Sequence, residues 1–303
     1  MIDPDRRAFP AVAMAFWSAR PRRPLHPVLT GAPLLIAHRG GAGLAPENTL
    51  AAFLPAIHRW RVDMIEMDVR ATAEGRCVVI HDATVDRTTD GTGEVATMTC
   101  EELSRLDAGY RFTTDGGRTF PFRGQGVTIP AIEDVLEALP DARLTVEVKT
   151  AAAQAPLFDA IDRFVAADRV VVAGMHDADR GAFARHAGAV SASTEQMRAW
   201  VIRHWFRLGR GGRLRADVAQ LPEHAEGRRI VTLRLIRALK AQGIPVHVWT
   251  VNDESDMRRL LAWGVEGLIT DRPDVAARVL HDVAGRPLPT QPRPPDEVRA
   301  QGA

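Results

Sequence analysis

Two pairs of charged residues in this sequence have the spacing of neighbours on one face of a β-strand. Glu66 and Asp68 are two residues apart, and Glu147 and Lys149 repeat the spacing. Three carboxylates buried together cost much free energy unless they are paired or hold a cation. Hard oxygen ligands on rigid strands suit Mg²⁺ or Ca²⁺ better than zinc, so these acids predict a divalent metal site. The alternative is a salt-bridge network completed by Lys149 and Arg39.

Two histidines lie beside these pairs and indicate acid–base chemistry. His38 ends a predicted strand and is followed by Arg39, and His81 ends another predicted strand. Imidazoles are the usual general acids and bases near neutral pH. The Arg39 guanidinium can donate two hydrogen bonds to one anion, and the Lys149 ammonium adds a single positive charge. Cation, arginine and lysine together predict a site for a phosphate ester, since they oppose the charge that grows as its bond breaks.

The elements that position these residues alternate between strands and helices. The predicted barrel strands are Leu34–His38, Met64–Val69, Leu144–Lys149, Val170–Gly174, Val190–Ser193, Asp217–Leu221, Val246–Val251 and Gly267–Thr270. The predicted helices are Thr49–Trp60, Ile132–Ala138, Pro156–Ala166, Ala178–His186, Glu195–Leu208, Leu233–Gln242 and Glu254–Trp263. Eight strands that alternate with helices predict the α/β fold of a TIM (β/α)8 barrel.

One predicted strand, Cys77–His81, breaks the alternation. It follows the second barrel strand too closely for a parallel crossover, so we expect an antiparallel hairpin with its turn at Glu74-Gly75. That register places Asp68 opposite His81. The stretch 83–130 is rich in Thr, Gly and Asp and is expected to be a small insertion over one end of the barrel.

Composition and charge exclude several classes of protein. The 303 residues are 46% hydrophobic and 25% charged, which is typical of a globular chain. The 39 Lys and Arg residues balance 38 Asp and Glu residues, so no nucleic-acid partner is expected. Cys77 and Cys100 lack the spacing of a zinc finger or of a disulfide scaffold, which leaves at most one isolated disulfide.

The domain prediction has three parts: an N-terminal arm at 1–32, one barrel domain at 33–280 that contains the insertion, and a Pro-rich disordered tail at 281–303. The apolar run Phe9–Trp17 follows two arginines but is short for an export signal and lacks a clean cleavage site. A cytoplasmic protein is therefore expected, with export by this weak signal as the alternative.

The segment 195–215 combines apolar helical spacing with six arginines between Arg198 and Arg215. The residues at helical spacing are Met197, Trp200, Val201, His204, Trp205 and Leu208. We expect a barrel helix that packs by one face and is solvated by its arginines. The alternative is a peripheral contact with an anionic membrane or with an acyl chain, which would make lysophospholipids substrates.

Seven short motifs of this chain, in order and at similar spacing, resemble those of the glycerophosphodiester phosphodiesterases. They are His38-Arg39-Gly40, Pro46-Glu47-Asn48-Thr49, Glu66-Met67-Asp68-Val69, His81-Asp82, Glu147-Val148-Lys149, Trp249-Thr250-Val251-Asn252 and Gly267-Leu268-Ile269-Thr270-Asp271. The resemblance extends from about Leu34 to Asp274. Met175-His176 departs from it, because many members of the family have Ser-Phe there.

The resemblance implies hydrolysis of glycerophosphodiesters to an alcohol and sn-glycerol 3-phosphate. The roles that it implies are metal ligation by Glu66, Asp68 and Glu147, acid–base catalysis by His38 and His81, and phosphate binding by Arg39 and Lys149. It also implies that Trp249 packs on the glycerol, although a core aromatic would have the same spacing. Glu47 and Asn252 are expected to orient loops and site groups.

Two other functions remain open at this point. A lysophospholipase D or a cyclising phosphodiesterase could use the same scaffold and a similar set of residues. A non-catalytic barrel that binds phosphodiester ligands is the alternative from another class.

Overall fold

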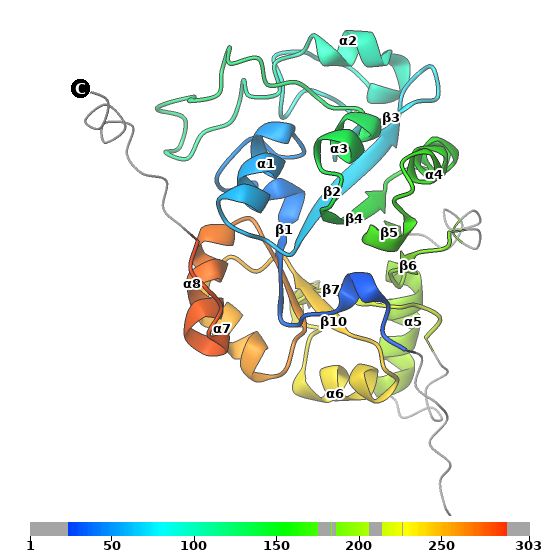
Figure 1. Cartoon of the computed structure of the whole chain (residues 1–303), viewed down its shortest axis with the longest axis vertical. Coiled ribbons are helices and arrows are strands. Elements are labelled where there is room, and N and C mark those ends of the chain that lie inside the picture. Colours follow the sequence, from blue (N-terminus) through cyan, green and yellow to red (C-terminus); the bar gives the residue numbers. More distant parts are fainter. Residues whose placement is uncertain (1–23, 175–182, 184–185, 206–213, 226, 290–303) are drawn as a thin grey trace, which may run out of the picture.

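The computed structural model describes residues 24–174, 183, 186–205, 214–225 and 227–289 (Figure 1). The candidate export signal Phe9–Trp17, the pair Met175-His176 and most of the helix predicted at Ala178–His186 lie outside these residues. The predicted arm and tail also lie largely outside them, so the domain boundaries and the cytoplasmic location stay predictions.

Eight parallel strands form the barrel that the sequence predicts. In spatial order they are β6 (Ala189–Val190), β5 (Val170–Gly174), β4 (Arg143–Val148), β2 (Met64–Ala71), β1 (Leu34–Ala37), β11 (Gly267–Thr270), β10 (Val246–Trp249) and β7 (Ala219–Pro222). A parallel bridge between Ser191 and Val218 joins the two end strands. The amide of Ala192 donates to the carbonyl of Val218 at 2.9 Å, so the sheet closes on itself.

Successive side chains along each strand point alternately into the barrel and toward the helices that cover its outside. In β2, Ile65, Met67 and Val69 belong to the apolar layer beneath the helices. Met64 faces the other way and packs with Leu34, Ile36, Val171 and other residues in a separate apolar cluster inside the barrel. Glu66 and Asp68 follow Met64 at a spacing of two residues, so they point inward and lie toward the carboxyl end of the strand.

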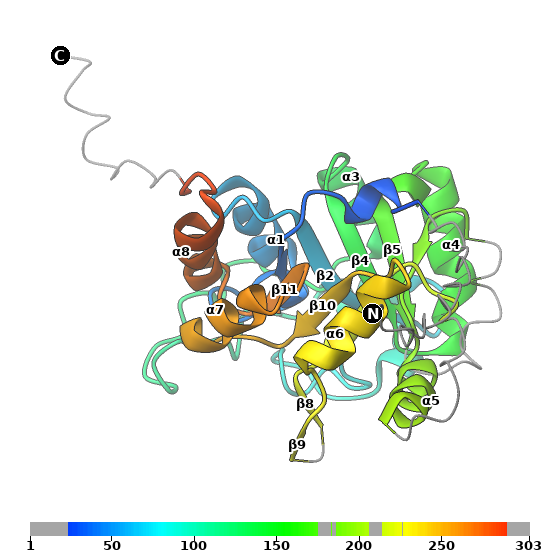
Figure 2. The same ribbon diagram turned by 90° about the horizontal axis from the view of Figure 1, so that it is seen from below.

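Helices surround the strands (Figure 2). They are α1 (Leu50–His58), α3 (Ile132–Ala138), α4 (Gln154–Arg163), α5 (Thr194–Trp205), α6 (Leu233–Ala241), α7 (Glu254–Ala262) and α8 (Pro273–Ala284). Side chains of Thr49, Thr232 and Asp253 cap the first turns of α1, α6 and α7. Among the described residues, no helix has the length and apolarity that crossing a membrane requires.

The antiparallel hairpin is confirmed, but the predicted register is wrong by one residue. Strand β3 (Cys77–Val79) pairs with β2 through Val69 and Val79, so Ile80 rather than His81 stands opposite Asp68, and its amide donates to the carbonyl of Asp68 at 2.9 Å. The amide of Thr72 donates to the carbonyl of Arg76, which closes a loop of three residues instead of a two-residue turn.

The stretch after β3 is an insertion, as expected, and it has a small apolar cluster of its own. Helix α2 (Cys100–Ser104) begins at a capping box formed by Thr99 and Glu102, and Leu103 is fully buried in the cluster. Figure 1 shows the insertion along the top of the view, from α2 to loops that extend beyond α1, on the side of the barrel opposite α6. Cys77 and Cys100 are both free thiols.

Ordered structure extends beyond both predicted domain boundaries. Val28 and Leu29, in the predicted arm, are buried in the apolar cluster inside the barrel. At the other end α8 continues past residue 280, and Arg286 forms an ion pair with Asp63. Helix α8 was not predicted, although a proline at its start and Gly285 at its end mark a helix. A second hairpin, β8 (His224–Ala225) with β9 (Arg228–Arg229), was not predicted either.

Candidate active site

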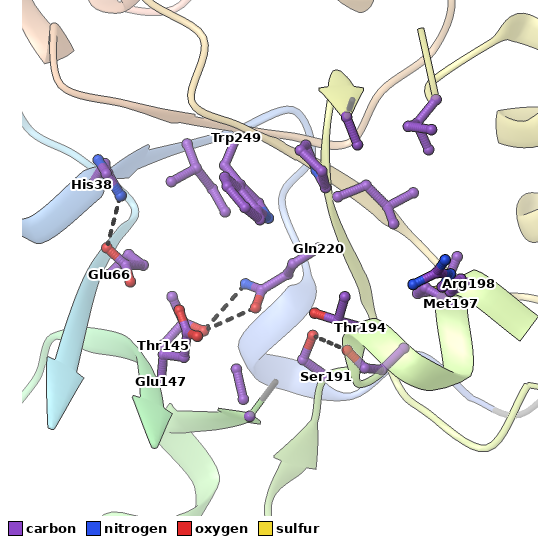
Figure 3. A pocket seen from close by; sticks show the side chains of 18 of the residues that line it. His38, Glu66, Thr145, Glu147, Ser191, Thr194, Met197, Arg198, Gln220 and Trp249 are labelled. Carbon is purple, nitrogen blue, oxygen red and sulfur yellow. Dashed lines mark hydrogen bonds and ion pairs between the residues drawn. The ribbon is translucent and has the colours of Figure 1, made fainter. Parts of the chain in front are cut away.

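Eight of the ten predicted site residues line one pocket of about 620 Å³ at the carboxyl ends of the barrel strands. They are His38, Arg39, Glu66, Asp68, His81, Glu147, Lys149 and Trp249. Figure 3 shows His38, Glu66 and Glu147 at one end of the pocket, Met197 and Arg198 at the other, and Trp249 between them. Of the other two predicted residues, Glu47 accepts a hydrogen bond from Arg39 at 2.9 Å, and Asn252 donates one to Asp271 at 2.8 Å.

The three predicted metal ligands converge. Asp68 and Glu147 stand directly opposite each other in the parallel pairing of β2 with β4. One carboxylate oxygen from each of Glu66, Asp68 and Glu147 lies within 4.8 Å of the others. A divalent cation bound by oxygen ligands at 2.0–2.6 Å needs such a spacing.

Asp68 is the most strongly paired of the three acids. Its carboxylate lies 3.0 Å from the Lys149 ammonium and 3.1 Å from Nε of Arg39, and it accepts a hydrogen bond from the Asn48 amide at 2.9 Å. Burial by itself raises the pKa of Asp68, but these partners outweigh it and the net shift is downward. Asp68 is therefore an anion at neutral pH.

Glu66 is buried without such compensation. Its carboxylate accepts a hydrogen bond from the backbone amide of Arg39 at 2.8 Å, and Nε2 of His38 lies 3.9 Å away. No cationic side chain comes closer among the residues that the structure describes. Burial, together with the charges of Asp68 and Glu147, raises the pKa of Glu66 to about 8. A further positive charge at this end of the pocket would therefore stabilise the ionised form of Glu66.

The two predicted phosphate-binding residues lie against the acids. Lys149 is 2.9 Å from Glu147 as well as 3.0 Å from Asp68. Arg39 donates to Glu47 at 2.9 Å, and its backbone is held at a positive φ of 49°. The salt-bridge network that the sequence left as an alternative is thus present around Asp68 and Glu147, whereas among the described residues Glu66 has only Nε2 of His38, 3.9 Å away.

Each histidine is oriented by a carboxylate at Nδ1, which leaves Nε2 for other partners. His38 Nδ1 lies 2.6 Å from Asp271, and Asn252 donates to the same carboxylate at 2.8 Å. Burial lowers the pKa of His38, but Asp271 and Glu66 raise it by more, so the net shift is upward. Asp271 comes directly after β11, a position that marks it as a site residue, but it was not among the predicted site residues.

His81 is held by a chain of contacts from the insertion. Its Nδ1 lies 2.6 Å from Asp82, which accepts a hydrogen bond from Arg87 at 2.6 Å. Arg87 also donates twice to Glu47, at 2.7 Å each. The hydrogen bonds from Arg87 and His81 lower the pKa of Asp82 to about 2. Glu47 therefore connects Arg39 and Arg87.

Trp249 and His247 point into the barrel at different depths. Trp249 is 41% exposed and lines the pocket, whereas His247 is fully buried below it, as expected. This exposure favours a contact with a ligand over the role of a core aromatic. Thr145 and Gln220 form a hydrogen-bonded polar floor between the acids and the rest of the pocket, and sequence reasoning did not identify either.

The fold and the site define a class, a (β/α)8 barrel with an acidic, histidine-lined pocket at the carboxyl ends of its strands. A family model described as the glycerophosphoryl diester phosphodiesterase family matches residues 38–275. The chain therefore belongs to this family and is an enzyme of the glycerophosphodiester phosphodiesterase class.

Similarity to individual proteins supports this family assignment. The chain is 33% identical to a glycerophosphodiester phosphodiesterase of Caldanaerobacter subterraneus over 80% of this chain and 95% of the relative. It is 30% identical to a glycerophosphodiester phosphodiesterase of Bacillus altitudinis over 82% of this chain and 98% of the relative. An Oleispira antarctica phosphodiesterase, solved in complex with the product sn-glycerol-3-phosphate, shares the fold with a TM-score of 0.65 at 23% identity, covering 82% of this chain and 97% of that one.

Proposed function

We propose that this enzyme hydrolyses glycerophosphodiesters to an alcohol and sn-glycerol 3-phosphate, with His38 and His81 as the acid–base pair. The observation that carries the proposal is the shared pocket, which brings both imidazoles to the carboxylate cluster and to two cationic side chains. The non-catalytic alternative is disfavoured, because binding a phosphodiester needs the cations but not two histidines oriented by carboxylates.

The two histidines supply the proton transfers. One imidazole takes a proton from the attacking hydroxyl, and the other gives a proton to the leaving alcohol oxygen. Asp271 and Asp82 hold Nδ1 of His38 and of His81, so each ring presents Nε2 to the pocket. The attacking hydroxyl comes from water, or from the glycerol 2-position in a route through a cyclic phosphate.

The acidic cluster fits a divalent cation. Three carboxylates supply oxygen ligands within 4.8 Å of one another, and burial together with the charges of Asp68 and Glu147 disfavours the charge on Glu66. We propose Mg²⁺ or Ca²⁺ at Glu66, Asp68 and Glu147. Such an ion would polarise a phosphoryl oxygen of the bound substrate.

Other side chains position the substrate. Lys149 and Arg39 place positive charge beside the cluster, where phosphate oxygens would compete with the carboxylates for them. Trp249 offers a partly exposed ring for the glycerol. Glu47 and Asn252 act indirectly, since Glu47 holds Arg39 and Asn252 holds Asp271.

Phosphorus NMR of glycerophosphocholine incubated with the purified protein and Mg²⁺ tests the reaction. The expected result is a single new signal of sn-glycerol 3-phosphate with release of choline. A cyclic glycerol phosphate that persists would show the cyclising reaction instead. An unchanged substrate with every divalent cation tried would favour the non-catalytic alternative.

Replacing Asp271 by asparagine is expected to lower kcat on the order of 10²-fold with a smaller change in KM, because His38 loses the carboxylate that fixes its tautomer. Since Asp271 helps to raise the pKa of His38, the limb of the pH–rate profile that His38 sets should move to lower pH. Steady-state kinetics across pH check both effects.

Asp282→Asn is the matched control, because Asp282 lies on α8 and pairs with Arg258 outside the pocket. A kcat for Asp271→Asn within about threefold of the wild-type value, with an unmoved pH profile, would mean that Asp271 does not position His38.

A further inference from the structure

The pocket continues past the polar residues of the proposed reaction into a second, apolar part. We call this part the apolar arm, and define it by its large apolar side chains. They are Met197, Val201 and Ile202 of α5, Leu221 and Pro222 of β7, Ile230, and Trp249 at the junction with the polar part. Figure 3 shows that Met197 lies at the end of the pocket away from His38 and Glu66.

The walls of the arm combine a rigid base with exposed apolar surface. Met197, Val201 and Leu221 are at most 6% exposed and belong to the main apolar core, so the base is preformed. Ile202 is 43% exposed and Trp249 is 41% exposed. Helix α5 thus packs on the barrel by one face, as expected, and also presents an apolar side chain to the pocket. A large apolar surface that opens from a polar site indicates a ligand with an apolar part.

The charges along the arm disfavour a cationic occupant. Its charged lining residues are Arg198 and Arg228, both at exposed positions. Within the described part of the chain, the only carboxylates that line the pocket are those of the acidic cluster at its other end. The methylene stems of arginine can extend an apolar wall while the guanidinium groups remain in water. A hydrocarbon chain therefore suits the arm better than a choline or ethanolamine group does.

We propose that the apolar arm holds the hydrocarbon chain of a monoacylated glycerophosphodiester, so that lysophospholipids are substrates of this enzyme. The inference rests on the proposed function and names a substrate class for the same site. The water oxygen bonds to phosphorus, the bond between phosphorus and the alcohol oxygen breaks, and the alcohol leaves with a proton. The products are an acylglycerol phosphate and the free alcohol, and the acyl ester stays intact.

The test is a comparison of kcat/KM for glycerophosphocholine and for lysophosphatidylcholines with chains of about 6, 8, 10 and 12 carbons, each below its micelle concentration. Burial of one methylene is worth about a fourfold gain in affinity, so kcat/KM should rise by up to about fourfold per added carbon until the arm is full. Release of choline is measured for every substrate, and mass spectrometry checks that the acyl ester survives.

The variant Ile202→Gln should lower the ratio of kcat/KM for the 12-carbon substrate to that for glycerophosphocholine by about tenfold. The ratio is independent of the fraction of folded enzyme, so a folding defect cannot imitate the result. Val283→Gln is the matched control, because Val283 is also a β-branched side chain exposed on a helix but lies outside the pocket. Its ratio should equal that of the wild-type enzyme.

The outcomes separate this inference from the function on which it rests. Turnover of glycerophosphocholine with no gain along the chain series would overturn the inference and leave the proposed function intact. A gain that appears only with micelles or anionic vesicles, and not with monomeric substrate, would also overturn it and indicate a contact with a lipid surface instead. No turnover of any of these diesters would contradict the proposed function itself.

Discussion

Replacing Glu66 by glutamine is expected to lower kcat/KM for glycerophosphocholine by roughly 10³-fold, since a metal ligand contributes several kcal/mol to transition-state stabilisation. The same change should leave the metal-free protein at least as stable at pH 7. The pKa of Glu66 is raised from its ordinary value of 4.5 to about 8 in the folded chain, so the unfolded chain loses this proton first and the free energy of unfolding falls as pH rises between these two values. A neutral glutamine of nearly the same shape removes that penalty.

Steady-state kinetics and thermal unfolding in the presence of a chelator measure the two effects. Glu137→Gln, at an exposed position of α3 outside the pocket, is the control for the loss of one carboxylate. A Glu66→Gln enzyme that keeps more than a tenth of the wild-type kcat/KM would show that Glu66 is not a ligand of a catalytic cation. A large loss of thermal stability would instead show that its carboxylate supports the fold.

Loss of either histidine is expected to cause the second large decrease in activity. His38→Ala and His81→Ala are each expected to lower kcat by 10²- to 10⁴-fold, the usual range for general acid–base catalysis. The double variant should be little worse than the more damaged single variant, because residues that act as a unit are not additive. Measurement of kcat for the three variants checks this, with His58→Ala, exposed on α1, as the control.

A better leaving group should distinguish the two histidines. A nitrophenyl ester of glycerol phosphate needs little protonation as it leaves, so the variant that lacks the general acid should recover much of its lost rate on this substrate. The variant that lacks the general base should not recover. Equal defects of both variants on both substrates would contradict a division into acid and base.

The barrel and the acidic cluster could be predicted because both follow from local patterns. Alternating apolar and polar residues place Glu66 and Asp68 on one face of β2, and the strands lie where β-branched runs indicate them. The His81 register was wrong because it depended on the length of one turn, and Ala73 joins Glu74 and Gly75 in the observed loop. A shift of one residue moves every cross-strand neighbour.

The supporting contacts could not be predicted because they join residues far apart in the chain. Asp271 meets His38 across 233 residues, and Arg87 meets Glu47 across 40. No periodicity encodes such pairs; they follow from closure of the barrel and from the path of the insertion. The apolar arm could not be predicted for the same reason, because it too joins residues far apart in the chain. Its residues come from α5, β7, β10 and the segment near β9, and the helical pattern around Met197 could not show that one side chain, Ile202, turns toward a pocket.

The proposed reaction depends most on a cation held by acids from β2 and β4, and one measurement tests this dependence directly. The rate of glycerophosphocholine hydrolysis is followed for enzyme freed of metal by a chelator, while Mg²⁺ or Ca²⁺ is added back. We expect almost no hydrolysis without metal, and a saturable recovery in wild-type enzyme that Glu147→Gln weakens. Full activity in metal-depleted enzyme, verified by elemental analysis, would contradict the proposed metal site.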